Sequence, residues 1–210
     1  MISLQGFTQT TLPLVESPVT AKHNTMVIFF SGDGGWRELD QAVTAYLNSK
    51  NIPVVGVNTK KYLWEEKKPA EIADDIQTLI KKYGTLWKAS NVVLLGYSMG
   101  AEILPHSVNE LEPAYAEKIK DMILIAPAQN ACYEIKLIFY AYDTNEGEPI
   151  IDQLKKLKIK NAYCICDDHK ISLCKSGLDG VIDHTELTGG HHFDGDYDVL
   201  CGVIGKRLNL

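Results

Sequence analysis

Ser98 lies at the centre of a Gly-x-Ser-x-Gly pentapeptide, Gly96-Tyr97-Ser98-Met99-Gly100, between a short apolar run and a helix-forming segment. Strand, tight turn and helix in this order are typical of a nucleophile elbow, in which a serine hydroxyl projects from the end of a buried strand. Both glycines are needed because so sharp a turn leaves no room for a Cβ atom beside the neighbouring backbone. The pattern also occurs by chance in Gly-rich turns, and its place after an apolar strand favours a nucleophile.

A serine hydroxyl attacks at neutral pH only beside a base, and a third group must orient that base. His191 and His192 follow a glycine pair after the last predicted strand, and Asp167 and Asp168 follow the strand before it. We expect His191 to be the base, because its loop can turn the imidazole toward Ser98, with His192 as the alternative base or a loop-locking donor. We expect Asp168 to be the acid, with Asp167 as the alternative or as a loop cap.

A second Gly-rich segment, Ser31–Trp36, follows the first long apolar run. Its glycines allow backbone N–H groups to point toward a developing negative oxygen. We predict an oxyanion hole formed by the backbone N–H of Met99 and that of Asp33 or Gly34. The segment lacks the Lys-Ser/Thr ending of a P-loop and the glycine spacing of a dinucleotide fingerprint, so no nucleotide cofactor is expected.

Three cysteines and a histidine lie close together near the predicted acid: Cys164, Cys166, His169 and Cys174. Their spacing matches no standard Cys/His zinc arrangement, and two of them fall within a predicted strand, so we expect no metal site. A disulfide from Cys174 to Cys164 or to Cys166 would instead pin the acid-bearing loop in an exported protein.

Apolar runs of strand length alternate with helical patterns along the chain. The predicted strands cover residues 26–30, 52–57, 92–95, 122–125, 162–166 and 181–187, with a possible strand at 134–140 and a short edge strand at 12–16. The predicted helices cover residues 39–47, 69–84, the segment after Ser98, and 196–208. This alternation predicts an α/β fold with a mostly parallel sheet covered by helices on both faces, in one domain spanning 1–210. All candidate residues would lie at the carboxyl ends of strands, where such sheets bind ligands.

Composition narrows the classes of partner. The formal net charge of −6 and the absence of a long Lys/Arg block argue against nucleic acid. No apolar run approaches the roughly 18 residues of a membrane span, and the first residues lack the pattern of a signal peptide. The protein is therefore expected either in the cytoplasm or in an exported form whose leader has been removed.

The chain order Ser, Asp, His is that of α/β-hydrolases. With these motifs in place, the chain resembles the bacterial virulence protein family VirJ/AcvB within that superfamily. The resemblance rests on four blocks: Leu12–Glu16; Ser31–Trp36 with Leu39 and Asp40; Gly96–Ala101; and Gly189–Tyr197. It implies a periplasmic protein that hydrolyses lysyl-phosphatidylglycerol, a membrane lipid esterified with an amino acid.

The resemblance implies ester cleavage by a Ser-His-Asp triad without a cofactor. A cationic lysyl group favours acidic surroundings, and Glu102, just after the elbow, is a candidate for them. Only about 35 residues separate the strands near Leu124 and Cys164, too few for a large lid, so we expect an open site that meets a head group at a bilayer surface. Two rival functions are an esterase or thioesterase for a small soluble substrate, and a non-catalytic binding protein with the same fold. The sequence identifies no protein partner.

Overall fold

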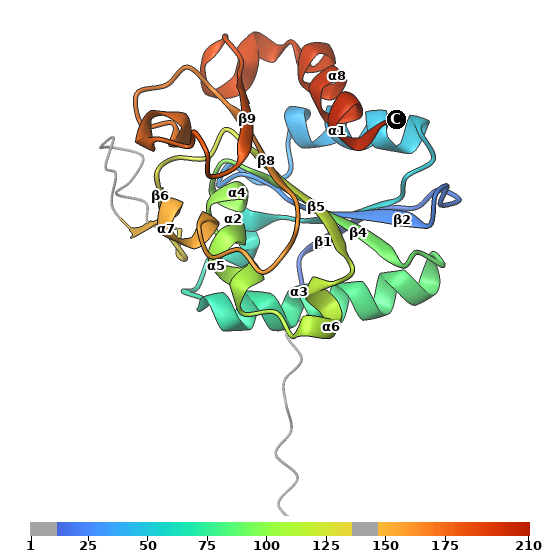
Figure 1. The fold of residues 1–210 in the computed structure, drawn as a ribbon. Helices are drawn as coiled ribbons and strands as arrows, with labels where there is room; N and C mark the ends of the chain where they lie inside the picture. Colours follow the sequence, from blue (N-terminus) through green and yellow to red (C-terminus); the bar gives the residue numbers. More distant parts are fainter. Residues whose placement is uncertain (1–11, 136–146) are drawn as a thin grey trace, which may run out of the picture.

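The computed structural model describes residues 12–135 and 147–210. Within them, seven strands form one sheet in the order β1-β3-β2-β4-β5-β8-β9 (Figure 1). All neighbouring pairs are parallel except β1 with β3, which makes β1 an antiparallel edge strand. The strands are β1 (Leu14–Ser17), β2 (Thr25–Phe30), β3 (Val54–Val57), β4 (Asn91–Tyr97), β5 (Ile119–Ile125), β8 (Ala162–Cys166) and β9 (Asp183–Glu186). The predicted α/β fold with a mostly parallel sheet is confirmed.

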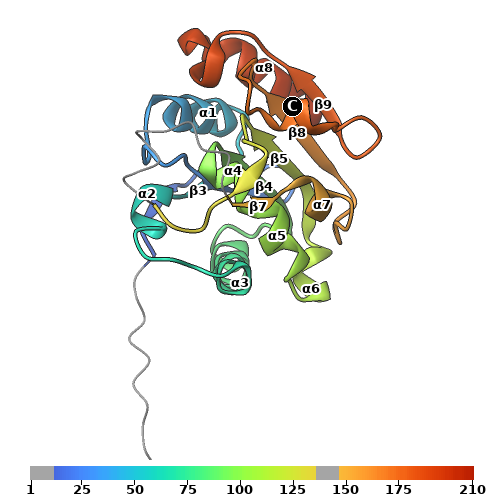
Figure 2. The same cartoon turned by 90° about the vertical axis from the view of Figure 1, so that its left-hand side faces the viewer.

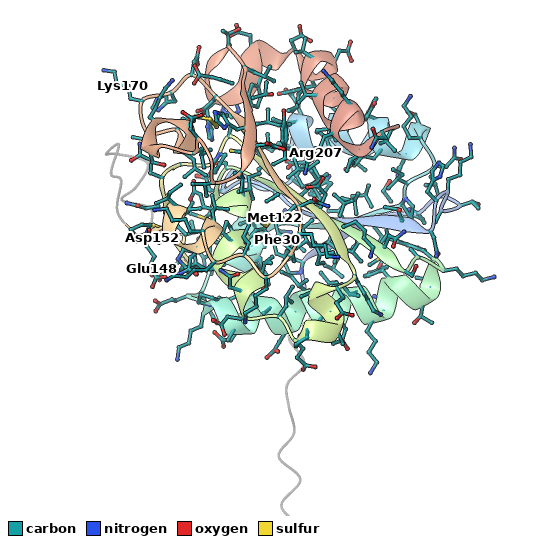
Figure 3. All side chains as sticks on the ribbon, in the orientation of Figure 1. Phe30, Met122, Glu148, Asp152, Lys170 and Arg207 are labelled. Atoms are coloured by element: carbon teal, nitrogen blue, oxygen red, sulfur yellow. A yellow bond between two sulfur atoms is a disulfide. The ribbon has the colours of Figure 1, made fainter. Side chains whose placement is uncertain are left out.

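Helices cover both faces of this sheet (Figures 1 and 2). One face packs against α1 (Glu38–Ser49) and α8 (Tyr197–Leu208), and the other against α3 (Pro69–Leu86) and α5 (Leu104–Asn109). Successive strand residues point to opposite faces, so each strand feeds both cores. In β2, Phe29 joins the α1 and α8 core, while Phe30 joins the α3 and α5 core together with Met122 of β5 (Figure 3).

Shorter elements complete the described part of the chain. They are α2 (Thr59–Tyr62), α4 (Met99–Glu102), α6 (Pro113–Ala116), α7 (Ile151–Leu154), the 3₁₀ helices Leu173–Ser176 and Gly190–Gly195, and the antiparallel pair β6 (Asn130–Ala131) and β7 (Glu148–Pro149). The described part of the connection from β5 to β8 holds only β6, β7 and α7, and no lid helix occurs in it. Most of the possible strand 134–140 lies outside the described residues.

Two helix predictions differ from the structure. Helix α3 continues past Gly84 to Leu86 because buried Tyr83 anchors its last turn. Its hydroxyl donates a hydrogen bond to Glu16, and its ring contacts that of Trp87 in a tilted arrangement. The single helix expected after Ser98 is divided into α4 and α5 at Ile103. Neither difference moves the candidate residues, which follow the carboxyl ends of β2, β4, β8 and β9.

The turn between β4 and α4 is tight enough to exclude side chains at both glycines. Ser98 adopts φ +52° and ψ −125°, a strained conformation for a residue with a Cβ atom. A Cβ atom on Gly96 would lie 2.5 Å from the Cα atom of Ala101. A Cβ atom on Gly100 would overlap the backbone carbonyl oxygens of Phe30 and Ser31, at the end of β2. The elbow is therefore packed backbone to backbone against the neighbouring strand.

Substitution of Gly100 tests this packing. We expect Gly100→Ala to lower the free energy of unfolding by about 2 kcal/mol or more, because its methyl group meets backbone that cannot move aside. The matched control is Gly202→Ala on the exposed face of α8, where the added Cβ atom would meet nothing within 4 Å beyond its chain neighbours and the backbone of its own helix. That variant should be stabilised by about 0.5–1 kcal/mol through helix propensity. Urea unfolding measures the free energy of unfolding of both variants. An equal change in Gly100→Ala and Gly202→Ala would contradict the close packing of Gly100 against β2.

Candidate active site

Three side chains from three loops form a continuous hydrogen-bonded chain. His191 Nε2 lies 2.8 Å from Ser98 Oγ, and His191 Nδ1 lies 2.7 Å from Asp167 Oδ2. Ser98 is only 8% exposed and Asp167 only 2%. With Nδ1–H donating to the carboxylate, Nε2 is left to accept the serine proton, which is the geometry of a Ser-His-Asp triad.

The expected roles of the two aspartates are reversed in the structure. Asp167, the first residue beyond β8, points inward to His191. Asp168 is exposed and its Oδ1 accepts a 3.0 Å hydrogen bond from the backbone N–H of Gly190. The prediction of Asp168 as the orienting acid was therefore wrong. One residue farther from the strand end, its carboxylate reaches the backbone of the histidine loop instead of the imidazole.

The charge of Asp167 follows from these surroundings. Burial alone would raise the pKa of this carboxyl. The hydrogen bond and the charge of His191, with further contributions from Ser172 and the His169 backbone, together outweigh burial and hold the pKa below its usual range. Asp167 is consequently ionised at neutral pH. An ionised, buried acceptor fixes the tautomer of His191 that presents an unprotonated Nε2 to Ser98.

The loop carrying His191 is held in shape by backbone conformation and by a buried ring. Gly189 has φ +101°, and a Cβ atom there would lie 2.6 Å from the carbonyl carbon of Phe193. Phe193 itself has φ +53° and buries its ring in the core beneath α1 and α8. The turn therefore requires glycine at 189, and Phe193 fixes the loop to the fold.

Tyr97 is a positioning residue that the sequence analysis missed. Its hydroxyl donates a 3.0 Å hydrogen bond to the backbone carbonyl of His191 and lies 2.8 Å from Nδ1 of His192. Its ring stacks on that of His191 with centroids 5.4 Å apart. His192 thus takes the loop-locking role foreseen as its alternative, and the structure does not place it on Ser98. The aromatic residue inside the Gly-x-Ser-x-Gly motif was the available signal.

The expected oxyanion donors lie in the residue after Ser98 and in the loop after β2. Met99 N–H occupies the first position of α4, where an amide has no intrahelical acceptor. Gly32 of the β2 loop lies close to the serine: an added Cβ atom there would lie 3.4 Å from the Cβ atom of Ser98. Asp33 and Gly34 follow and line the neighbouring cleft. Their assignment as the second donor stays a prediction.

Two hollows meet at His191. A cavity of about 300 Å³ is bordered by Ser98, Glu102, Pro127, Ile171 and His191. A larger cleft of about 990 Å³, also bordered by His191, runs along the β2 loop past Asp33, Arg37 and Tyr197. Ser98 therefore lines the small cavity, and His191 lines both hollows.

A disulfide between Cys166 and Cys174 closes the loop that follows β8. Of the two pairings considered from the sequence, the structure has the one that uses Cys166, directly before Asp167. Cys164 remains a buried thiol, with its Sγ 3.3 Å from that of Cys166.

Among residues 12–135 and 147–210, no group of three His, Cys, Asp or Glu side chains is arranged to hold a metal ion. No helix in these ranges has the length and apolar character needed to cross a bilayer.

Sheet order, elbow and triad geometry together define an α/β-hydrolase fold. The model of the family described as bacterial virulence protein (VirJ) matches residues 24–209, so the chain belongs to that family. A search of curated protein sequences found no match.

Solved structures support the fold assignment. MenH from S. aureus shares 13% identity at a TM-score of 0.65, with 95% of this chain and 98% of that one covered. Est1E from Butyrivibrio proteoclasticus, in complex with ferulic acid, shares 12% identity at a TM-score of 0.64, with 93% and 94% covered. A lipase-esterase related protein from Clostridium acetobutylicum shares 14% identity at a TM-score of 0.64, with 93% and 98% covered. Identities this low establish the fold alone.

The disulfide predicts a measurable stabilisation. Cross-linking two residues 8 positions apart removes chain entropy from the unfolded state, worth about 2.5 kcal/mol. We expect the double variant Cys166→Ala/Cys174→Ala to lose at least about that much free energy of unfolding in urea. A reductant should destabilise the unaltered protein and leave the double variant unchanged. Alkylation that labels Cys174 without reduction would contradict the pairing.

Proposed function

We propose that the protein is a serine esterase that cleaves a carboxylic ester through Ser98, His191 and Asp167. The observation that supports this most directly is the unbroken hydrogen-bonded chain from the serine hydroxyl to the buried carboxylate. The solved structures of the same fold include Est1E and a lipase-esterase related protein. Fold likeness alone does not fix an activity, so the proposal depends on the geometry of the three side chains.

In the proposed mechanism, Ser98 Oγ attacks the ester carbonyl carbon while His191 Nε2 takes the serine proton. Met99 N–H, with Asp33 or Gly34 N–H, stabilises the negative oxygen of the tetrahedral intermediate. The intermediate collapses when the imidazolium returns the proton to the departing alcohol, leaving an acyl group on Ser98. Water, activated by the same imidazole, then releases the acid. Asp167 stabilises the imidazolium without being protonated.

We further propose an aminoacylated phospholipid, lysyl-phosphatidylglycerol, as the substrate, as the resemblance to VirJ/AcvB implies. The unequal sizes of the two hollows that share His191 support this proposal. The cavity of about 300 Å³ that Ser98 lines has a volume at the lower end for small-molecule sites, and it suits the aminoacyl group. The cleft of about 990 Å³ along the β2 loop suits the bulkier lipid alcohol.

The small cavity also favours a second candidate, an esterase or thioesterase for a short soluble acyl substrate. A soluble enzyme of this kind would cleave short esters equally well with and without lipid vesicles. The lipid enzyme would be faster on lysyl-phosphatidylglycerol in vesicles than on any soluble lysyl ester.

We propose that the protein acts in the periplasm. The Cys166–Cys174 disulfide supports this, because disulfides persist in oxidising compartments. A cytoplasmic location remains the alternative, and under it the pair would be reduced.

Contact with the membrane surface is part of the same proposal. Trp64 follows α2, beyond the carboxyl end of β3, and is 61% exposed. β3 is parallel to β2 and β4, so Trp64 lies at the edge of the sheet that carries Ser98. Exposed tryptophans suit the interface between lipid head groups and acyl chains. Trp64 would hold this edge against the bilayer.

The first test concerns the triad. On p-nitrophenyl acetate, we expect Ser98→Ala to abolish both hydrolysis and labelling by a fluorophosphonate. His191→Ala and Asp167→Asn should each lower kcat by about 10³–10⁴-fold, because the serine loses its base or the base loses its tautomer. Asp168→Asn is the matched control: its amide oxygen can still accept the Gly190 N–H bond, so kcat should fall less than about tenfold. An equal loss in both aspartate variants would contradict the assignment of Asp167.

The second test concerns the membrane contact. We expect Trp64→Ala to weaken binding to phosphatidylglycerol vesicles by about tenfold, as loss of one buried aromatic side chain would. Leu86→Ala provides the control, because Leu86 is 60% exposed but lies at the end of α3, toward the amino-terminal edge of β4. Vesicle sedimentation measures both. If both variants bind vesicles like the unaltered protein, Trp64 is not the anchor.

A further inference from the structure

The cavity beside Ser98 has apolar walls on one side and two buried carboxyl groups. Ala126, Pro127 and Ile171 form the apolar part. The polar part consists of Ser98, Asp167, His169, Ser172 and His191 together with Glu102, which is only 8% exposed. The carboxylate of Asp167 is already bound to His191. A carboxyl group in such surroundings is costly unless something compensates its charge. Glu102 is not one of the three triad side chains, so its place in this cavity calls for a separate explanation.

Backbone geometry fixes the position of Glu102 relative to the nucleophile. It is four residues after Ser98, and its N–H donates a 3.0 Å hydrogen bond to the Ser98 carbonyl. Residues spaced i and i+4 lie on the same helix face, and a helical side chain leans back over the preceding turn. Glu102 Oε1 accepts a 3.2 Å hydrogen bond from the backbone N–H of Ala128, which ties the carboxyl to the cavity wall.

No Lys or Arg side chain is among the described residues that line this cavity. Lys170, in the loop that borders it, extends away into solvent (Figure 3). Burial raises the pKa of Glu102 to about 7, although the Ala128 N–H bond and the charge of His191 oppose the rise; the charge of Asp33 adds to it. A cation bound in the cavity would favour the ionised form of this carboxyl.

From these observations we infer that Glu102 is a specificity-determining residue that binds an ammonium group carried by the acyl part of the substrate. The inference rests on the proposed esterase function and adds to it the residue that would select a cationic acyl group over a neutral one. The apolar walls would contact the aliphatic part of the chain, and the carboxylate would accept hydrogen bonds from its cationic end. A neutral acyl group of the same length would leave the charge of Glu102 without a cationic partner, with only the Ala128 N–H bound to it.

The test compares esters that differ only in the ammonium group. Methyl esters of lysine and norleucine differ at the end of the side chain, and those of 6-aminohexanoate and hexanoate differ there without an α-amino group. Methyl esters of alanine and propionate differ in the α-amino group. We expect the unaltered protein to prefer the cationic member of at least one pair by tenfold or more in kcat/KM. The pair that shows the preference identifies which ammonium group Glu102 binds.

Glu102→Gln keeps an oxygen for the Ala128 N–H while removing the charge. We expect it to lower the ratio of kcat/KM between cationic and neutral ester at least tenfold. A purely structural role would lower both values and leave that ratio unchanged, which would overturn the inference. Glu110→Gln is the matched control, because Glu110 is exposed and outside the cavity and its loss changes net charge equally. This control should keep the ratio of the unaltered protein.

A measurement on the unaltered protein keeps the inference testable if Glu102→Gln fails to fold. Butylamine should inhibit hydrolysis of p-nitrophenyl acetate more strongly than butanol, and equal inhibition would overturn the role of Glu102. Hydrolysis without any preference for cationic esters would overturn the inference while leaving the esterase function intact. If no ester is hydrolysed and a fluorophosphonate leaves Ser98 unlabelled, the proposed function itself fails, and the inference with it.

Discussion

The close approach of the elbow to the end of β2 is the constraint on which the site depends. Because Gly100 packs against the carbonyl groups of Phe30 and Ser31, helix α4 begins directly beneath the β2 loop. Ser98 is thereby held between that loop, which carries the expected oxyanion donor, and the loops after β8 and β9. The strained φ of Ser98 persists because β4 and α4 are fixed on either side of it. The position of the Ser98 hydroxyl relative to His191 therefore depends on the packing of the elbow against β2.

The residues predictable from sequence were those whose chemistry needs a local pattern. Ser98 has its glycines, and His191 follows a glycine pair whose first member has a backbone that only glycine readily adopts. The strands were predictable because burial on both faces gives continuous apolar runs. The choice between Asp167 and Asp168 has no such pattern. It depends on which of two adjacent carboxyl groups after β8 points inward to His191. The structure has Asp167 in that position, whereas the sequence analysis chose Asp168.

Long-range contacts account for the rest of what was missed. Tyr97 occupies a variable position of the motif, and only the fold brings its hydroxyl to a loop that lies 94 residues along the chain. The end of α3 was misplaced at Gly84 for a similar reason, since Tyr83 is anchored by Glu16 from β1. A glycine signals where a helix can stop, whereas tertiary packing decides whether it does.

The buried acids Asp167 and Glu102 show how one site sets two carboxyl groups to different tasks. Both lose hydration, which raises the pKa of each. Asp167 gains a direct hydrogen bond from the His191 ring, so its pKa falls and its charge is secured before any substrate arrives. Glu102 has a neutral backbone donor and only a weaker influence from His191, so its pKa stays near 7. In the proposed mechanism the carboxylate of Asp167 orients the base, while that of Glu102 is the group that we infer to bind a positive charge. Under that inference, the cavity is better suited to a cationic acyl chain than to a neutral one.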